Sequence, residues 1–489
     1  MPKIRSDFSN LRVTVAGLGR FGGGVAVAKW LVARGAKVLV TDRDPIDKLT
    51  DSVKQLAGLP IEFILGEHRE RDFTSCDLLV VNPAIPPSNP FLLAAQNARV
   101  PITTEMNLFV ERCPTRNTIG VTGTKGKSTT TALLGRMLNA ACPDGRHSAW
   151  RTIENARRQQ PASRSQTPLI RDLGEPKKHP APAIVGDLAA ARCIYVGGNI
   201  GVSLLEKLDE ITEHDIVVLE LSSAMLHHLG TIHWSPHVAL VTMVSADHID
   251  WHGSAEAYLD AKQNIVRFQT EKDFAVVSAH LPGSRAFGKL TKGTIIEFGK
   301  RANLPEAFAP KIPGKHNRIN ERGAYAAAKL FGVYVDEAVK EVADFGGLPH
   351  RLEVVHESAG VRWVNDSIAT IPEAAIAANA AFPIGKVIQI VGGVDKGNDM
   401  REMCRVLGER CKAILTIGKC GSTLAELSRS NTSKAKIIEC ETLDRAVSQA
   451  GSLATEGDVV LLSTACASYD QFRNFEDRGE RFSRLARGV

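Results

Sequence analysis

The 489-residue chain lacks the apolar segments that would place a protein in or across a membrane. No run approaches the ~18 consecutive apolar residues of a spanning helix, and the opening MPKIRSDFSN lacks the apolar centre of a secretory signal. The nine cysteines include neither a CxxC pair nor a Cys/His cluster, which argues against a zinc site or a disulfide framework. We therefore expect a cytoplasmic protein with reduced thiols and no membrane span.

The composition is that of a soluble globular protein, with 44% hydrophobic and 23% charged residues. The net charge of +6 does not by itself indicate a nucleic-acid partner, because residues 143–180 hold eight Lys or Arg and four Asp or Glu and so carry +4 of it. The same segment has five prolines and little apolar periodicity. We interpret it as a basic, flexible insertion, either a solvated loop or a contact for RNA or a membrane.

A glycine-rich segment, residues 120–130, is the clearest functional signal and reads GVTGTKGKSTT. Backbone N–H groups of such a loop bind phosphate oxygens at the positive end of a helix, while Lys127 offsets phosphate charge and Ser128 lies beside Mg²⁺. An ordinary P-loop has glycine five positions before its Gly-Lys pair, where this chain has Val121. A glycine turn without a ligand is the alternative, but turn geometry alone explains the Gly-Lys-Ser-Thr run poorly.

Alternating strand and helix patterns predict an α/β protein of three domains, each built on a parallel sheet. At the usual ~150 residues per domain, the length also fits three. We expect a Rossmann-like domain over 1–113, a P-loop-type ATP-binding domain over 114–346 and a second Rossmann-like domain over 347–489. Strands are predicted over 117–121, 215–221, 238–244, 361–365, 387–392, 413–417 and 459–463, with a helix over 129–138 after the glycine-rich loop.

The first predicted domain opens with a nucleotide-binding pattern. After the buried-strand sequence LRVTVAG come Gly17, Gly19 and Gly22, and a strand predicted over 37–41 leads to Asp42. This spacing is that of a Rossmann-like βαβ unit. The same helix N-terminus suits a dinucleotide or another nucleotide diphosphate, so the pattern alone does not select the ligand.

Polar residues near the ends of predicted strands are further candidates. Glu220 ends the apolar strand IVVLEL, so its carboxylate emerges where ligands bind to parallel sheets, unless it is a surface group or a helix cap. His248 follows another buried strand and is either a metal ligand or a loop histidine; Mg²⁺ prefers oxygen ligands, so a histidine would be unusual. Lys262 lies on a predicted helix, where a lysine is normally solvated, and its spacing does not distinguish it.

Two further pairs of residues suit a nucleotide. Asn317 belongs to the sequence GKHN, which precedes a predicted helix, and Asn320 lies three residues on, so their amides share a face and either contact a base or cap the helix. Arg351 follows Pro349, and Asp366 follows the predicted strand VRWVN. A guanidinium fork suits phosphate, and a strand-end aspartate suits ribose hydroxyls.

Taken together, these motifs resemble those of the Mur ligases of peptidoglycan synthesis, whose phosphate loop has the form TGTxGK[ST], as residues 122–128 do here. The resemblance covers nearly the whole chain outside residues 143–180. The final motif, STACASYDQFRNFEDRGERF at 463–482, is similar to that of the family members that add D-glutamate. The other motifs follow in the family's order: GGNIG at 197–201, ELSS at 220–223, DHIDWHGS at 247–254, GKHN at 314–317 and LPHR at 348–351.

The resemblance implies an ATP-dependent amide ligase that joins D-glutamate to UDP-N-acetylmuramoyl-L-alanine in cytoplasmic precursor synthesis, releasing ADP and phosphate. The substrate carboxylate would form an acyl phosphate, which the amine attacks through a tetrahedral intermediate. The C-terminal domain would close over the nucleotide and exclude water. The resemblance further implies two Mg²⁺ ions, a carbamylated Lys262 and small-molecule partners only, without nucleic acid, and we expect a monomer.

The resemblance also assigns residues to four groups. It assigns the UDP substrate to Gly17, Gly19, Gly22, Asp42, Arg43, Asn199 and Ser222. It assigns ATP to Gly123, Thr124, Lys125, Gly126, Lys127, Ser128, Thr129, Asn317, Asn320, Arg351 and Asp366. It assigns catalysis to Lys127, Glu220, His248 and Lys262. It assigns metal binding to Ser128, Glu220, His248 and carbamylated Lys262. It assigns binding of the amino acid to Thr370, Lys396, Ser468 and Phe475.

The chain departs from the family pattern at one predicted amino-acid contact. The D-glutamate enzymes often read DSKATN where residues 366–371 read DSIATI, so Ile368 replaces a lysine. One positive contact near the amino acid's carboxylate is then absent or supplied elsewhere, and a ligase for L-glutamate or another amino acid is the alternative. An NAD-dependent dehydrogenase is less favoured because the sequence offers no hydride site, and a P-loop switch protein leaves the STACAS motif unexplained.

Overall fold

The computed structural model describes residues 8–19, 22–142, 193–200, 203–245, 249–299, 312, 314–395, 397–430 and 434–488. The predicted insertion at 143–180, His248 and Lys396 lie outside these residues. The chain divides into two compact units, one of Met1–Glu306 with Ile319–Glu341 and one of Ala307–Arg318 with Val342–Val489. Within the described ranges, no helix combines the length and the apolar character needed to cross a membrane.

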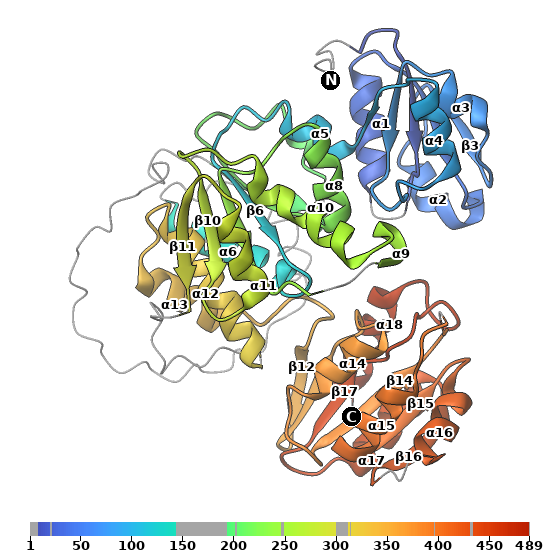
Figure 1. The fold of residues 1–489 in the computed structure, drawn as a ribbon. Helices are drawn as coiled ribbons and strands as arrows, with labels where there is room; N and C mark the ends of the chain where they lie inside the picture. The colour runs from blue at the N-terminus through green and yellow to red at the C-terminus, as the bar shows by residue number, and fades with distance from the viewer. Residues whose placement is uncertain are drawn as a thin grey trace. The chain divides into compact units, whose positions relative to one another are not determined.

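The N-terminal sheet has five parallel strands in the order β3-β2-β1-β4-β5 (Figure 1). Its central strand is buried from its second residue on, as expected where helices cover both faces of a parallel sheet. The strands are β1 (Arg12–Ala16), β2 (Lys37–Asp42), β3 (Ile61–Leu65), β4 (Leu78–Val81) and β5 (Ile102–Thr103). The helices are α1 (Gly23–Ala33), α2 (Ile46–Lys54), α3 (Glu70–Thr74), α4 (Pro90–Asn97) and α5 (Glu105–Val110).

The second sheet of the first unit has six parallel strands in the order β11-β10-β9-β6-β8-β7. Strand β6, which precedes the glycine-rich loop, is buried along its whole length. The strands are β6 (Thr118–Thr122), β7 (Ile194–Gly198), β8 (Ile216–Glu220), β9 (Val238–Val241), β10 (Phe274–Ser278) and β11 (Thr294–Phe298). The helices are α6 (Lys127–Ala141), η1 (Leu205–Lys207), α8 (Ser223–Thr231), α9 (Ile249–His252), α10 (Ala255–Arg267), α11 (Pro282–Arg285), η2 (Ala286–Lys289), α12 (Lys315–Lys329) and α13 (Val335–Asp344).

The sheet of the second unit has the order β12-β13-β17-β14-β15-β16 and is parallel except at one edge. Its strands are β12 (Glu353–Ser358), β13 (Val361–Asn365), β14 (Val387–Gly392), β15 (Cys411–Ile417), β16 (Lys436–Glu441) and β17 (Val459–Leu462). Its helices are α14 (Pro372–Asn379), α15 (Arg401–Arg410), α16 (Gly421–Ser430), α17 (Leu443–Leu453) and α18 (Phe475–Ala486).

The edge pair β12–β13 is antiparallel, and no strand was predicted from the sequence at 353–358. Only Ala359 and Gly360 connect the two strands, and both have positive φ, at 49° and 72°. Two such residues form a tight hairpin turn, which leaves no chain for the crossover that a parallel pair needs. A second correction concerns GKHN, since α12 begins at Lys315 and Asn317 therefore lies in its first turn.

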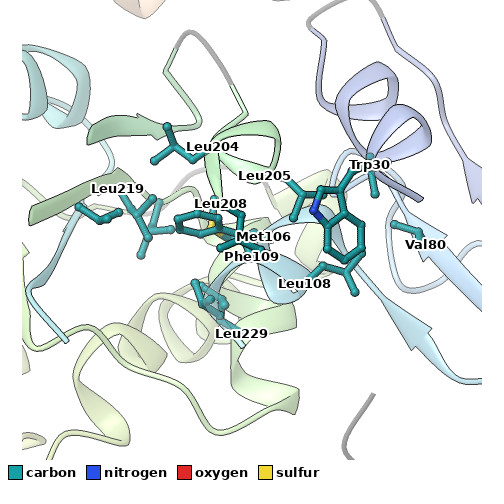
Figure 2. Packing of buried hydrophobic residues seen from close by; sticks show 14 of the residues in the cluster. Trp30, Val80, Met106, Leu108, Phe109, Leu204, Leu205, Leu208, Leu219 and Leu229 are labelled. Carbon is teal, nitrogen blue, oxygen red and sulfur yellow. The ribbon is translucent and has the colours of Figure 1, made fainter. Parts of the chain in front are cut away.

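One hydrophobic cluster extends through the first two sheets and explains why they form a single unit. Trp30 on α1, Leu108 and Phe109 on α5, and Leu205 on η1 all belong to it and are buried, and α1 contacts both α5 and η1 (Figure 2). At the margin of the cluster, the Arg34 guanidinium lies 4.0 Å from the centre of the Trp30 ring. Continuous burial of this kind packs the first two sheets into one unit.

Candidate active site

The glycine-rich loop connects β6 to α6, which confirms the predicted strand, loop and helix. Gly126 has φ of 91° and lies at the N-cap of α6, where a Cβ atom would fall 2.3 Å from Asn320 Oδ1. Gly123 has φ of 153°, and a Cβ atom there would fall 1.9 Å from Thr242 Oγ1. Neither contact is physically possible, so the packing around the loop requires glycine at both positions.

Hydrogen bonds fix this loop against the segment that follows β9. The backbone N–H of Thr124 donates to the Met243 carbonyl at 2.6 Å, and Thr242 Oγ1 donates to the Lys125 carbonyl at 2.8 Å. Lys127 Nζ donates to the Gly123 and Thr124 carbonyls at 3.0 and 3.2 Å, so its ammonium lies along the loop. Ser128 and Thr129 follow in the first turn of α6, at the positive end of the helix dipole.

Glu220, the last residue of β8, is 1% exposed. Its Oε1 accepts a hydrogen bond of 2.9 Å from Asn199 Nδ2, whereas its buried Oε2 accepts none from the residues that the structure describes. Leaving a carboxylate oxygen buried and unsatisfied is unfavourable unless a cation or a donor completes it. This oxygen therefore fits a divalent cation. Ser222, two residues on, instead caps α8 by accepting from the Met225 N–H at 3.2 Å.

Lys262 is 1% exposed, unlike most lysines on helices, which are solvated. Its Nζ donates to the Gly123 carbonyl at 2.9 Å and to Thr122 Oγ1 at 3.3 Å. Tyr258, Ala261 and Ile265 on the same helix are also buried, so Lys262 occupies the inward face of α10 beneath the phosphate loop. The loop carbonyl of Gly123 thus accepts from both Lys127 and Lys262.

Other metal ligands do not gather around Glu220 among the residues that the structure describes, where no group of three His, Cys, Asp or Glu side chains is found. The predicted ligand His248 lies outside those residues. Of the predicted metal ligands, Glu220 with its Oε2 and Ser128 with its hydroxyl offer oxygen atoms in the described part of the chain. Carboxylate and hydroxyl oxygens are suitable ligands for Mg²⁺, which keeps several of its waters.

The glycine turn of the N-terminal sheet lies between β1 and β4, where the strand order reverses. Gly17 has φ of 85°, and its carbonyl accepts from Asn82 Nδ2 at 3.2 Å. Asp42 Oδ2 accepts from the Gly19 N–H at 3.0 Å, so this carboxylate holds the turn in place. Gly22 caps α1, and Arg43 is exposed to solvent.

In the second unit, Asp366 is buried at the end of β13. Its Oδ1 accepts from the Leu352 N–H at 3.1 Å, and its Oδ2 accepts from Ser463 Oγ at 2.7 Å. Burial raises the pKa of this carboxyl to about 7, although both hydrogen bonds and the nearby Arg351 favour the charged form. The group therefore titrates near neutral pH.

Two of the predicted amino-acid residues, Thr370 and Ser468, lie on segments that the structure joins. The buried Arg478 donates to Ser367 Oγ at 2.9 Å, to the Ser367 carbonyl at 2.8 Å and to the Cys466 carbonyl at 3.1 Å. Phe475 begins α18, and its carbonyl accepts from Ser367 Oγ at 2.8 Å. Segment 366–370, which ends in Thr370, and segment 463–468, which ends in the buried Ser468, are therefore tied together.

Several residues of the site were missed from the sequence. Tyr258 donates to or accepts from Thr124 Oγ1 at 2.7 Å and lies 5.1 Å, ring centre to Nζ, from Lys262. Its place four residues before Lys262 puts both on one helix face, which was a usable signal. Thr242 and Arg478 come from distant segments and carried no such signal. Asn317 and Asn320 are both buried on α12, as their shared face predicts.

Comparison with known proteins shows to which family the chain belongs. Three family descriptions match: Mur ligase MurD-like N-terminal domain at 11–104, Mur ligase middle domain at 190–328 and Mur ligase, glutamate ligase domain at 350–466. The UDP-N-acetylmuramoylalanine–D-glutamate ligase of Roseiflexus sp. is 36% identical over 97% of this chain and 98% of its own. The chain belongs to the Mur ligase family. The corresponding Enterococcus hirae protein is 33% identical over 96% and 95% of the two chains.

Solved structures show the same fold at lower identity. The UDP-N-acetylmuramate-alanine ligase MurC of Thermotoga maritima has a TM-score of 0.58 and 18% identity, over 98% of this chain and all of its own. The MurF ligase of T. maritima, solved with ADP, has a TM-score of 0.52 and 18% identity over 98% and 96%. The chain is thus a three-domain α/β Mur ligase, an ATP-dependent amide ligase of cell-wall peptidoglycan synthesis. The dehydrogenase and switch-protein interpretations are set aside.

We predict that Gly123→Ala lowers kcat/KM for ATP-dependent phosphate release by about 100-fold or more, because the added Cβ displaces a loop that must place phosphates to well within 1 Å. Gly288→Ala is the matched control in the same unit, since its Cβ would meet only ordinary contacts at 3.5 Å. Steady-state kinetics and circular dichroism on both variants check this. Equal turnover by the two would contradict the role given to the loop.

We also predict a pH-dependent contribution of Asp366 to stability. Its folded pKa of about 7 lies above the unfolded value of ~4, so its contribution is fully present below pH ~4 and is lost as pH rises through 7, by up to about 4 kcal/mol. In urea titrations between pH 5 and 8, Asp366→Asn should therefore flatten the decline in unfolding free energy. Asp399→Asn is the control and should leave that slope unchanged, because the pKa of Asp399 is about 2. A slope identical in wild type and Asp366→Asn would contradict this assignment.

Proposed function

We propose that this ligase joins D-glutamate to UDP-N-acetylmuramoyl-L-alanine. The site observation that carries the proposal is a phosphate loop whose sheet edge also holds Glu220, a buried carboxylate with one open oxygen. The amino acid and acceptor follow from relatives named for that reaction, which are 31–36% identical over nearly the whole chain. The final motif at 463–482 supports the same choice.

We assign the two nucleotides to different sheets. The glycine turn after β1, with Gly17, Gly19 and Gly22, suits the diphosphate of the UDP substrate, since the turn opens at a helix N-terminus where the strand order reverses. The loop after β6 suits ATP, with Gly126 and Lys127 at the phosphates. Arg351 and Asp366 of the second unit are proposed for phosphate and ribose.

The proposed chemistry starts from a carboxylate, which is a poor acyl donor. The alanyl carboxylate of the acceptor attacks the γ-phosphorus of ATP, the bond from that phosphorus to the β–γ bridging oxygen breaks, and ADP leaves; the resulting acyl phosphate has a good leaving group. The amine of the amino acid then attacks the carbonyl carbon, and inorganic phosphate departs from the tetrahedral intermediate. Lys127 and the loop N–H groups stabilise charge on the transferred phosphoryl oxygens, so positioning and electrostatics supply most of the acceleration.

Magnesium ions fit this site through Glu220 and Ser128, and when bound they offset charge on the phosphates. Lys262 is proposed to carry a carbamate. Its amine, once deprotonated, adds to the carbon of CO₂ and loses a second proton, which replaces a buried cation by an anionic oxygen ligand. The contacts of Lys262 with Gly123 and Thr122 support a place at the edge of the phosphate loop.

The amino-acid site is proposed on the joined segments 366–370 and 463–468, with Thr370, Ser468 and Phe475, together with Lys396. Ile368 adds no charge there, so L-glutamate or another amino acid is the second candidate. We also propose a monomer that acts in the cytoplasm on its small-molecule substrates, because ATP and UDP-linked precursors are used there.

The identity of the amino acid is tested by phosphate release from ATP with magnesium and UDP-N-acetylmuramoyl-L-alanine. We predict that D-glutamate supports kcat/KM at least about 100-fold above L-glutamate and other amino acids, because stereochemistry decides whether the amine reaches the activated carbonyl. Preference for L-glutamate would select the second candidate. Turnover with none of them would contradict the proposed reaction.

The role of Lys262 is tested by Lys262→Ala, which we predict to lose at least about 100-fold in kcat and to regain part of it with added acetate or formate. Lys329→Ala, on the exposed side of α12, is the matched control and should be unaffected. Wild-type protein equilibrated with ¹³C-labelled bicarbonate should show a carbamate carbon signal that Lys262→Ala lacks. Full activity of Lys262→Ala, or an identical spectrum in the two proteins, would refute the carbamate.

A further inference from the structure

Two cysteines of the second unit lie against each other, although 46 residues separate them in the chain. Cys420 ends the turn between β15 and α16, and Cys466 lies in the segment that follows β17. Their Sγ atoms are 3.3 Å apart. A disulfide bond is about 2.05 Å long, so an approach of roughly 1.3 Å would form one.

Hydrogen bonds hold the two segments that carry this pair against each other. The Lys419 N–H donates to Asp470 Oδ2 at 2.9 Å, which ties the turn before α16 to the segment that carries Cys466. The Cys420 N–H donates to the Gly393 carbonyl at 3.0 Å, and next to it Val394 and Ala467 exchange backbone hydrogen bonds of 2.8 and 3.1 Å. The two sulfur atoms are therefore held on neighbouring segments of the same unit.

The two thiols differ in access and in acidity. Cys466 is 1% exposed, whereas Cys420 is partly exposed, so a reagent in solvent reaches Cys420 first. The hydrogen bond from Cys466 and one from the Gly393 backbone lower the pKa of Cys420, and its place before the N-terminus of α16 favours the same charge. The same hydrogen bond and burial raise the pKa of Cys466, which keeps it a thiol donor.

We propose that Cys420 and Cys466 form a modification site, a dithiol that a small-molecule disulfide such as oxidised glutathione converts to an intramolecular disulfide. The Cys420 thiolate attacks one sulfur of the reagent, the reagent's S–S bond breaks, and one thiolate leaves. Cys466 then loses its proton to solvent, and its sulfur attacks Cys420 Sγ and expels the second thiolate. The protein loses two protons and two electrons, and the reagent takes them up and becomes two thiols.

The bond would change the segment that reaches Ser468. The Cys466 carbonyl accepts from Arg478, and Ser468 lies two residues on, so moving the Cys466 side chain toward Cys420 shifts the region that holds it. This consequence rests on the proposed amino-acid site. The oxidised protein should then have a higher KM for the amino acid, by about threefold or more, with the KM for ATP unchanged.

The site is tested on the full-length protein incubated with oxidised glutathione, digested without reductant and analysed by mass spectrometry. We expect one linked pair of peptides, Cys420 to Cys466, about 2 Da lighter than the two free peptides and reversed by dithiothreitol. Cys404→Ser is the matched control, because Cys404 is a buried thiol of the same unit. It should keep the link, whereas Cys420→Ser should lack it. No link in wild type, or a link from Cys420 to Cys404, would overturn the site.

A kinetic comparison separates this site from the proposed function. Oxidised wild type should show the raised KM for the amino acid, and Cys420→Ser, treated in the same way, should keep the KM of the reduced enzyme. An unchanged KM in the cross-linked protein would overturn the coupling to the amino-acid site. If no amino acid supports turnover, the proposed function fails, and the peptide map still decides whether the dithiol exists.

Discussion

The structure of the central site depends on a buried carboxylate that the protein satisfies only in part. Asn199 donates to one oxygen of Glu220, and within the described part of the chain the other oxygen has no donor although the residue is 1% exposed. Such a group is unfavourable in a closed core and becomes favourable when a cation completes it. Strand β8 places it at the same sheet edge as the phosphate loop after β6, because the two strands are parallel neighbours.

The loop beside Glu220 is held by side chains that also carry charge. Lys127 and Lys262 both donate to the Gly123 carbonyl, from α6 and α10, and Gly123 has no room for a side chain against Thr242. The Lys127 ammonium beside the loop and the second carboxylate oxygen of Glu220 on the next strand suit a ligand with phosphate oxygens and a divalent cation. Removal of Lys127 or Lys262, or addition of a methyl group at Gly123, would disturb the loop at this edge of the sheet.

Local sequence patterns were enough to predict the three sheets and the loop. Strand β13 and strand β14 have the predicted bounds, because each is a short apolar run between turn residues. The antiparallel edge at β12 was missed, since its cause is a two-residue turn at 359–360. The burial of Lys262 was also missed, because a lysine on an inward helix face looks like any other until the packing of α10 is known.

The features that no local pattern reveals are those made by distant segments. Arg478 joins the segments around Ser367 and Cys466. The second oxygen of Glu220 is unpaired because no donor among the described residues reaches it, which no local pattern reveals. In each sheet the motifs fall after strands that lie where the strand order reverses, so topology explains why residues far apart in sequence meet. A family resemblance pointed to many of these residues; it did not supply their contacts.

The central claim is that a phosphoryl group passes to a carboxylate at this edge, and isotope transfer tests it most directly. The acceptor, UDP-N-acetylmuramoyl-L-alanine, is labelled with ¹⁸O in its alanyl carboxylate, and the phosphate released during amide formation is analysed by mass spectrometry. The account predicts one ¹⁸O atom in each phosphate, because the carboxylate oxygen that attacks phosphorus leaves with it. Unlabelled phosphate, released together with the amide product, would contradict it.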